Sequence, residues 1–149
     1  MSLTTEIRIA STDAEIASCF PVMRELRPLL TAETFVARIR QQELMGYCLA
    51  FRAADGVTVA SAGFRILENL AWGRFLYVDD LVTLASARSH GHGSALLAWL
   101  EAFAADNGCD ELHLDSGVQR LDAHRFYDRE GMARTCLHFA KAVGKESTA

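Results

Sequence analysis

The sequence contains the stretch Arg88-Ser89-His90-Gly91-His92-Gly93 between a predicted strand and a predicted amphipathic helix. The helix is expected from Ser94 to Asn107, because large apolar residues recur at helical spacing between 96 and 103. Two glycines one residue apart let the backbone approach a ligand closely, and the first N–H groups of a helix have no partner within it. The stretch therefore predicts a site for a phosphate or pyrophosphate, to which Arg88 can add a charge-assisted contact.

The two common nucleotide-binding motifs do not fit this stretch. The dinucleotide fingerprint needs glycine or alanine at position 96, where this chain has Leu96. A P-loop needs lysine and then serine or threonine after the second glycine, whereas the chain reads Gly93-Ser94-Ala95. Neither nucleotide motif therefore describes this stretch, and a glycine pair before a helix is by itself often only a tight turn.

The sequence on either side predicts a mixed α/β domain built around one sheet. Strand 75–84 contains the acidic pair Asp79-Asp80, and because side chains alternate along a strand, only one of these two is expected to face a groove. After a short opening segment in which Ile7 and Ile9 alternate with polar residues, the other expected elements are a helix capped by Asp13, a helix from Thr31 to Gln42, strands 47–52, 57–67 and 111–115, a helix 123–130 capped by Asp122, and a last strand 134–143.

Length and composition limit the function classes. The 149 residues suit a single domain, 1–149, with a polar tail, 144–149, that is expected to be flexible. A net charge of −4 argues against a nucleic-acid binder. No apolar run is long enough to span a membrane, Met1–Glu6 does not resemble a signal peptide, and the four cysteines form no CxxC pair, so a cytoplasmic protein with reduced thiols is expected. His90 and His92 have no Cys, Asp or Glu partners at ligand spacing, so no metal site is expected.

A second element completes the pattern. Residues 88–93 read R-x-x-G-x-G, and the stretch Ala123 to Met132 matches an A-x-x-x-Tyr-x-x-x-Gly-Phe helix, with Met132 at the phenylalanine position. Together they resemble the GNAT superfamily of acetyl-CoA-dependent N-acetyltransferases. The resemblance covers most of the chain and is strongest from Phe75 to Met132.

The resemblance implies a fold and a set of contacts. The fold is a mixed, mostly antiparallel twisted sheet flanked by helices, with a splayed central strand pair that holds acetyl-CoA. The strand end pairs with the pantetheine arm, the loop wraps the pyrophosphate, and Tyr127 returns a proton to the departing thiolate. Two positions depart from the family pattern: Ala85 replaces a proline, and Arg120 replaces an asparagine that contacts pantetheine. The implied cofactor-binding residues are Leu81, Val82, Thr83, Arg88, Ser89, His90, Gly91, His92, Gly93, Ser94 and Arg120.

The expected reaction is direct attack of a primary amine, of a small molecule or peptide, on acetyl-CoA. An alkylamine is mostly protonated near pH 7, so a carboxylate is needed to accept its proton, and Asp115 and Asp80 are both candidates. The acidic charge suits a cationic acceptor. Two other functions stay open, namely a catalytically silent acyl-CoA-binding regulatory module and a plain interaction domain. The resemblance also allows a monomer or a homodimer.

Overall fold

The computed structural model describes residues 5–144, which form two compact units that meet in the sequence at Leu114 and Asp115. The predicted flexible tail lies outside the described residues, apart from Gly144. The first unit contains β1 (Thr5–Ile9), α1 (Asp13–Ser18), α2 (Phe20–Leu26), α3 (Ala32–Glu43), β2 (Cys48–Ala54), β3 (Val57–Asn69), β4 (Gly73–Thr83), the 3₁₀ turn η1 (Ala85–Ala87), α4 (His92–Asp106) and β5 (Glu111–Leu114); the second contains α5 (Leu121–Arg129).

The strands of the first unit form one sheet in the order β1-β2-β3-β4-β5. The first three neighbouring pairs are antiparallel, and β4 pairs with β5 in parallel. This confirms the predicted mixed, mostly antiparallel sheet. The parallel pairing ends at Val78 and Leu114, although β4 continues to Thr83. Along residues 79–83, β4 therefore has a backbone edge that β5 does not cover, as expected for a splayed strand pair.

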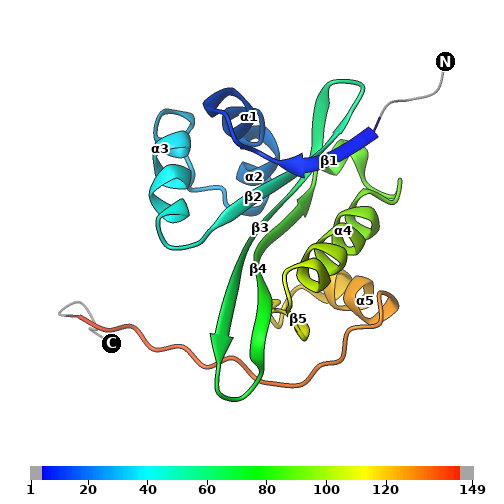
Figure 1. The fold of residues 1–149 in the computed structure, drawn as a ribbon. Coiled ribbons are helices and arrows are strands. Elements are labelled where there is room, and N and C mark those ends of the chain that lie inside the picture. Colours follow the sequence, from blue (N-terminus) through cyan, green and yellow to red (C-terminus); the bar gives the residue numbers. More distant parts are fainter. Residues whose placement is uncertain (1–4, 145–149) are drawn as a thin grey trace. The chain divides into compact units, whose positions relative to one another are not determined.

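Helices cover both faces of this sheet (Figure 1). On one face, α1, α2 and α3 pack through buried side chains such as Ile16, Val22 and Phe35 against Leu49 and Phe51 of β2. On the other face, α4 packs against β3 and β4, and the ring of Phe64 lies edge-on to that of Phe103, 5.2 Å between centroids. The predicted helix face of α4 is therefore the one that is buried.

Several element boundaries differ from the sequence prediction. The predicted first helix is divided into α1 and α2 at Cys19, just before Pro21, because proline suits the first turn of a new helix and lacks an N–H for the interior of an existing one. Thr12, rather than Asp13, caps α1, through a capping box with Glu15. In the second unit, Arg120 rather than Asp122 is the N-cap of α5.

The predicted strand 134–143 is wrong, because the structure shows no strand in this segment. The segment contains the large apolar residues Leu137, Phe139 and Val143 at every second or fourth position. A strand, however, exists only where another strand pairs with its backbone, and within the described residues β5 is paired with β4 alone. The local sequence of residues 134–143 was therefore insufficient to predict a strand.

A β-bulge in β4 reverses the prediction for the acidic pair. Gly63 of β3 pairs with Asp80, and the next residue, Phe64, pairs with Val78, so Asp79 is the extra residue in β4. The extra residue breaks the alternation of side chains, and both Asp79 and Asp80 line the same pocket. The expectation that only one of them faces a groove is therefore wrong.

Gly63 opposes this bulge and makes room for a tyrosine. A Cβ at position 63 would overlap the hydroxyl and ring of Tyr47, which is buried. The Tyr47 hydroxyl donates a hydrogen bond to Asp80 Oδ2 at 2.9 Å. The absence of a side chain at Gly63 therefore lets Tyr47 reach the second residue of the bulge.

We expect Gly63→Ala to destabilise the protein by about 1–3 kcal/mol, because the methyl group must displace buried Tyr47. Urea unfolding of wild type, Gly63→Ala, Tyr47→Ala and the double variant measures the effect and its coupling. The free energy of unfolding of the double variant should fall by less than the sum of the decreases in the two single variants. Ser61→Ala is the control on the same strand and should be close to neutral, because the buried Ser61 hydroxyl has no hydrogen-bond partner within residues 5–144. Additive losses would contradict the overlap.

Candidate active site

The glycine stretch forms a loop that leads into α4. Ser89 and Gly91 both have left-handed backbone conformations, with φ of 69° and 79°. Gly91 is the N-cap of α4, and its carbonyl accepts the first helical hydrogen bond, from Ala95 N at 3.0 Å. The N–H groups of residues 92–94 have no acceptor within the helix. Left-handed turns and a helix N-terminus together suit an anion, and the binding of a phosphate here stays a prediction.

The strand that leads into this loop is held in place by α2. Leu81 and Thr83 are half-buried, whereas Val82 is buried in the core that α1 and α2 cover. Just beyond β4, the backbone N–H of Ala85 donates a hydrogen bond to Glu25 Oε1 at 2.8 Å. The uncovered edge of β4 and the loop thus belong to one braced segment of the first unit.

The basic residues around the loop differ in exposure and in charge near neutral pH. Arg88 and His90 are exposed. His92, in contrast, has a lowered pKa, first because of partial burial and then because the positive charge of Arg52 lies nearby. Near neutral pH, His92 is therefore mostly uncharged and can contribute a backbone N–H to an anion but little positive charge.

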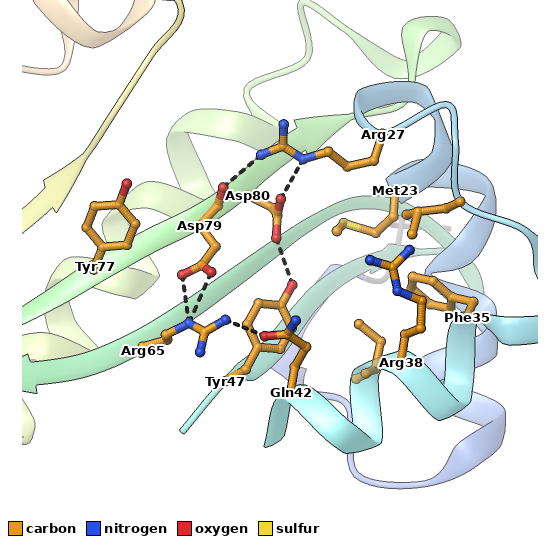
Figure 2. Close-up of a pocket in the computed structure, with 12 residues that line it drawn as sticks. Met23, Arg27, Phe35, Arg38, Gln42, Tyr47, Arg65, Tyr77, Asp79 and Asp80 are labelled. Carbon is orange, nitrogen blue, oxygen red and sulfur yellow. Dashed lines mark hydrogen bonds and ion pairs between the residues drawn. The ribbon is translucent and has the colours of Figure 1, made fainter. Parts of the chain in front are cut away.

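A pocket of about 340 Å³ lies in the first unit, beside the acidic pair of β4 (Figure 2). Its floor comes from β3 and β4 and its walls from α2 and α3. The lining residues are Met23, Arg27, Leu30, Phe35, Arg38, Ile39, Gln42, Tyr47, Arg65, Tyr77, Asp79 and Asp80.

Both acidic side chains of the pocket are paired with arginine. Asp80 accepts hydrogen bonds from Arg27 Nε at 2.9 Å through one oxygen and from Tyr47 through the other. Asp79 accepts from Arg65 Nε, at 3.0 and 3.3 Å to its two oxygens. Figure 2 shows the two carboxylates turned toward these partners. The Asp80 carboxylate is therefore held from two sides, whereas the Asp79 carboxylate is held from the side of Arg65.

Burial changes the proton affinities of this cluster. The pKa of Asp79 is raised, first by burial, although the hydrogen bond and the charge of Arg65 oppose the rise. The pKa of Tyr47 is raised well above its usual range, first by burial and then by the negative charge of Asp80. Tyr47 is therefore a hydrogen-bond donor throughout the ordinary pH range, and Asp79 is a better proton acceptor than an exposed aspartate.

Three of the predicted site residues lie in the second unit. Asp115 directly follows β5, and its Oδ1 lies 3.5 Å from His138 Nδ1. Arg120 precedes α5, and its carbonyl accepts a hydrogen bond from His124 N at 3.1 Å. Tyr127 lies on α5, and burial raises the pKa of its hydroxyl. The structure thus groups Asp80 with the glycine loop in the first unit and describes Asp115, Arg120 and Tyr127 in the second.

Sequence reasoning missed Arg27, Arg65 and Tyr47, which hold the two carboxylates. These residues lie between 14 and 53 positions from their partners, so no local motif connects them. The one available signal was the spacing in α3, where Phe35, Ile39 and Gln42 share a helix face. That face predicts packing against the sheet but does not identify the pocket.

Comparison with known proteins assigns the family. The model of the acetyltransferase (GNAT) family matches residues 10–132, and the chain belongs to this family. A relative in Bacillus subtilis (strain 168), the uncharacterized N-acetyltransferase YhdJ, is 34% identical over 131 residues, which cover 87% of this chain and 92% of the relative. The aminoalkylphosphonate N-acetyltransferase of Salmonella typhimurium is 41% identical over 98 residues, or 65% of this chain and 62% of that protein.

Solved structures support the same fold. The aminoglycoside N-acetyltransferase AAC(6')-Iy in complex with CoA superposes with a TM-score of 0.82 at 17% identity, covering 95% of this chain and 97% of that one. The protein is accordingly an N-acetyltransferase of the GNAT type with acetyl-CoA as its co-substrate. Within residues 5–144, no helix combines the length and apolarity needed to cross a membrane.

We expect Arg65→Met to raise the pKa of Asp79 further, because the guanidinium stabilises the charged carboxylate against the effect of burial. Titration of the Asp79 carboxyl carbon by NMR measures the pKa. Arg65→Lys keeps the positive charge without the same hydrogen-bond geometry and should produce a smaller rise. A pKa that stays constant or falls in Arg65→Met would show that this ion pair does not set the proton affinity of Asp79.

Proposed function

We propose that the protein transfers the acetyl group of acetyl-CoA to a primary amine of a small molecule or peptide bound in the pocket of Figure 2. The observation that supports this proposal most directly is the layout of one strand. Reading along β4, the carboxylates Asp79 and Asp80 face the pocket, the edge of residues 81–83 follows, and then comes the anion-binding loop. In this proposal, the acceptor site and the donor site therefore follow one another along β4 and the loop after it.

In this proposal, acetyl-CoA binds along residues 81–83 of β4 and the glycine loop that follows. Its pyrophosphate accepts hydrogen bonds from backbone N–H groups between Ser89 and Ser94, with Arg88 as an additional cation. Its pantetheine arm forms strand-like hydrogen bonds with Leu81, Val82 and Thr83, whose edge β5 leaves uncovered. The thioester then lies toward Asp79 and Asp80.

The chemical step requires two proton transfers. The amine nitrogen attacks the thioester carbonyl carbon, the C–S bond breaks, and an amide and a thiolate form. We assign the acceptance of the amine proton, directly or through a water molecule, to Asp79, because its pKa is raised and its carboxylate is held by Arg65 from one side. Asp80 then positions Tyr47 and Arg27. Tyr127, by the family resemblance, returns a proton to the thiolate, and Asp115 remains the alternative base.

The relatives support a small-molecule acceptor. Besides the aminoalkylphosphonate enzyme, an aminoglycoside N(6')-acetyltransferase of Serratia marcescens is 27% identical over 99 residues. Both names describe amines of small molecules, although the two classes differ in charge. The alternative function, a catalytically silent acyl-CoA-binding module, predicts that acetyl-CoA binds but that no amine releases CoA.

We expect Gly91→Glu to abolish acetyl-CoA binding, because a carboxylate would enter the anion-binding loop at a residue with φ of 79°. Titration calorimetry of wild type and variant measures the affinity. Gly108→Glu is the matched control, because Gly108 has a similar φ of 72° but lies just beyond the opposite end of α4. The control should bind as wild type does. Equal binding by all three proteins would place the donor elsewhere.

We expect Asp79→Asn and Tyr127→Phe each to lower kcat by about 10²-fold or more, because each removes a group assigned to a proton transfer. Acetyl-CoA affinity should change little in either variant. Thiol release at saturating amine, combined with calorimetry, separates the two effects. Full activity in one of these variants would remove that residue from the mechanism, and a lower kcat in Asp115→Asn alone would transfer the role of base to Asp115.

A further inference from the structure

The charges of the pocket do not cancel. Three arginine side chains and two carboxylates line it, which leaves a formal charge of +1 (three minus two). Arg27 is paired with Asp80, and Arg65 is paired with Asp79. Arg38 is the third arginine, and within residues 5–144 it forms no ion pair or hydrogen bond.

The position of Arg38 follows from the helix that carries it. Arg38 lies three residues after Phe35 and four before Gln42, so it shares the pocket-facing side of α3 with these residues. Figure 2 shows its guanidinium directed into the pocket. Arg40, two residues later on the same helix, is instead paired with Asp13 at 2.8 Å and Glu43 at 3.0 Å. The helix thus has one arginine tied to its own chain and one that is available to a ligand.

This distribution disfavours a purely cationic acceptor. A polyamine would meet two carboxylates that already have guanidinium partners, together with one uncompensated positive charge. The expectation from overall charge, that an acidic protein suits a cationic acceptor, therefore does not describe this pocket. A planar guanidinium is well matched to a carboxylate, phosphonate or phosphate, which it binds through two parallel hydrogen bonds.

We propose that the acceptor is a small amine that also bears an anionic group, which Arg38 binds while the amine faces Asp79. This inference rests on the proposed function, because it specifies the acceptor of that same site. The cavity of about 340 Å³ has the size of a small-molecule site. The anion fixes one end of the acceptor on α3, and the amine at the other end lies beside β4, where residues 81–83 are proposed to hold the donor.

The test compares amines that differ only in their second group. Thiol release is measured with an aminoalkylcarboxylate, an aminoalkylphosphonate, the neutral alkylamine of equal chain length and a polyamine. Wild type should have a kcat/KM at least about tenfold higher for an anionic amine than for the neutral one. Carboxylate and phosphonate are separate arms, and the faster of the two identifies the preferred anion.

Variants at position 38 connect this preference to the arginine. Arg38→Met should lower kcat/KM for the anionic amine on the order of 10- to 100-fold, as expected for a lost charged hydrogen bond, and leave the neutral amine within about twofold. Arg38→Lys should restore part of the preference. Arg24→Met is the matched control, because Arg24 is an exposed arginine on α2 that does not line the pocket. It should behave as wild type does.

Two results would overturn the inference in distinguishable ways. If the neutral amine or the polyamine is the best acceptor and Arg38→Met affects all amines equally, the assignment of an anionic acceptor is wrong, whereas the transferase function stands. If no amine in the series releases CoA although acetyl-CoA binds, the proposed function fails and this inference fails with it. Acetyl-CoA affinity, measured for every variant, shows whether the donor site is intact.

Discussion

The contact between Tyr47 and Gly63 supports the arrangement of the acidic pair in the pocket. Tyr47 occupies the space that a side chain at position 63 would need, and from there its hydroxyl donates to Asp80. Position 63 is also where the pairing of β3 and β4 shifts, which makes Asp79 the bulged residue. Because of the bulge, two consecutive carboxylates face one pocket, which a regular strand does not allow.

The arginines around this bulge determine what the carboxylates can do. Arg27 joins the end of α2 to β4 through the side chain of Asp80 and the backbone carbonyl of Asp79. Arg65 binds Asp79 from the neighbouring strand and also reaches Gln42 of α3. Helices and sheet are thus connected through the charged groups of the site. These pairs also leave Arg38 as the positive charge with which a ligand can interact.

The donor half of the site depends on a different constraint, the length of β5. Because β5 ends at Leu114, its pairing with β4 ends at Val78, and the backbone of residues 79–83 keeps one edge uncovered. The left-handed residues Ser89 and Gly91 then turn the chain into α4. Residues 84–91 connect this edge to the first residue of α4, and the hydrogen bond from Ala85 N to Glu25 Oε1 braces the connection.

The sequence by itself determined the features that depend on local order. The glycine loop, the helix after it and an α/β domain around one sheet could be predicted, because turn chemistry and apolar periodicity act over a few residues. The mixed sheet and the GNAT family followed from a resemblance that two local motifs carry, at residues 88–93 and 123–132. The pairing partners of strands cannot be seen in this way. The predicted strand 134–143 therefore failed, and so did the alternation of Asp79 and Asp80, because the bulge depends on β3, about 16 residues away.

Only the tertiary structure brought Tyr47, Arg27 and Arg65 to the acidic pair, since these residues come from three separate elements or their ends. The charge of the pocket followed from that assembly rather than from the net charge of −4. Net charge is a sum over the whole surface, whereas a ligand responds to the few groups within reach of it. The family could therefore be recognised from the sequence, but the character of the acceptor pocket required the fold.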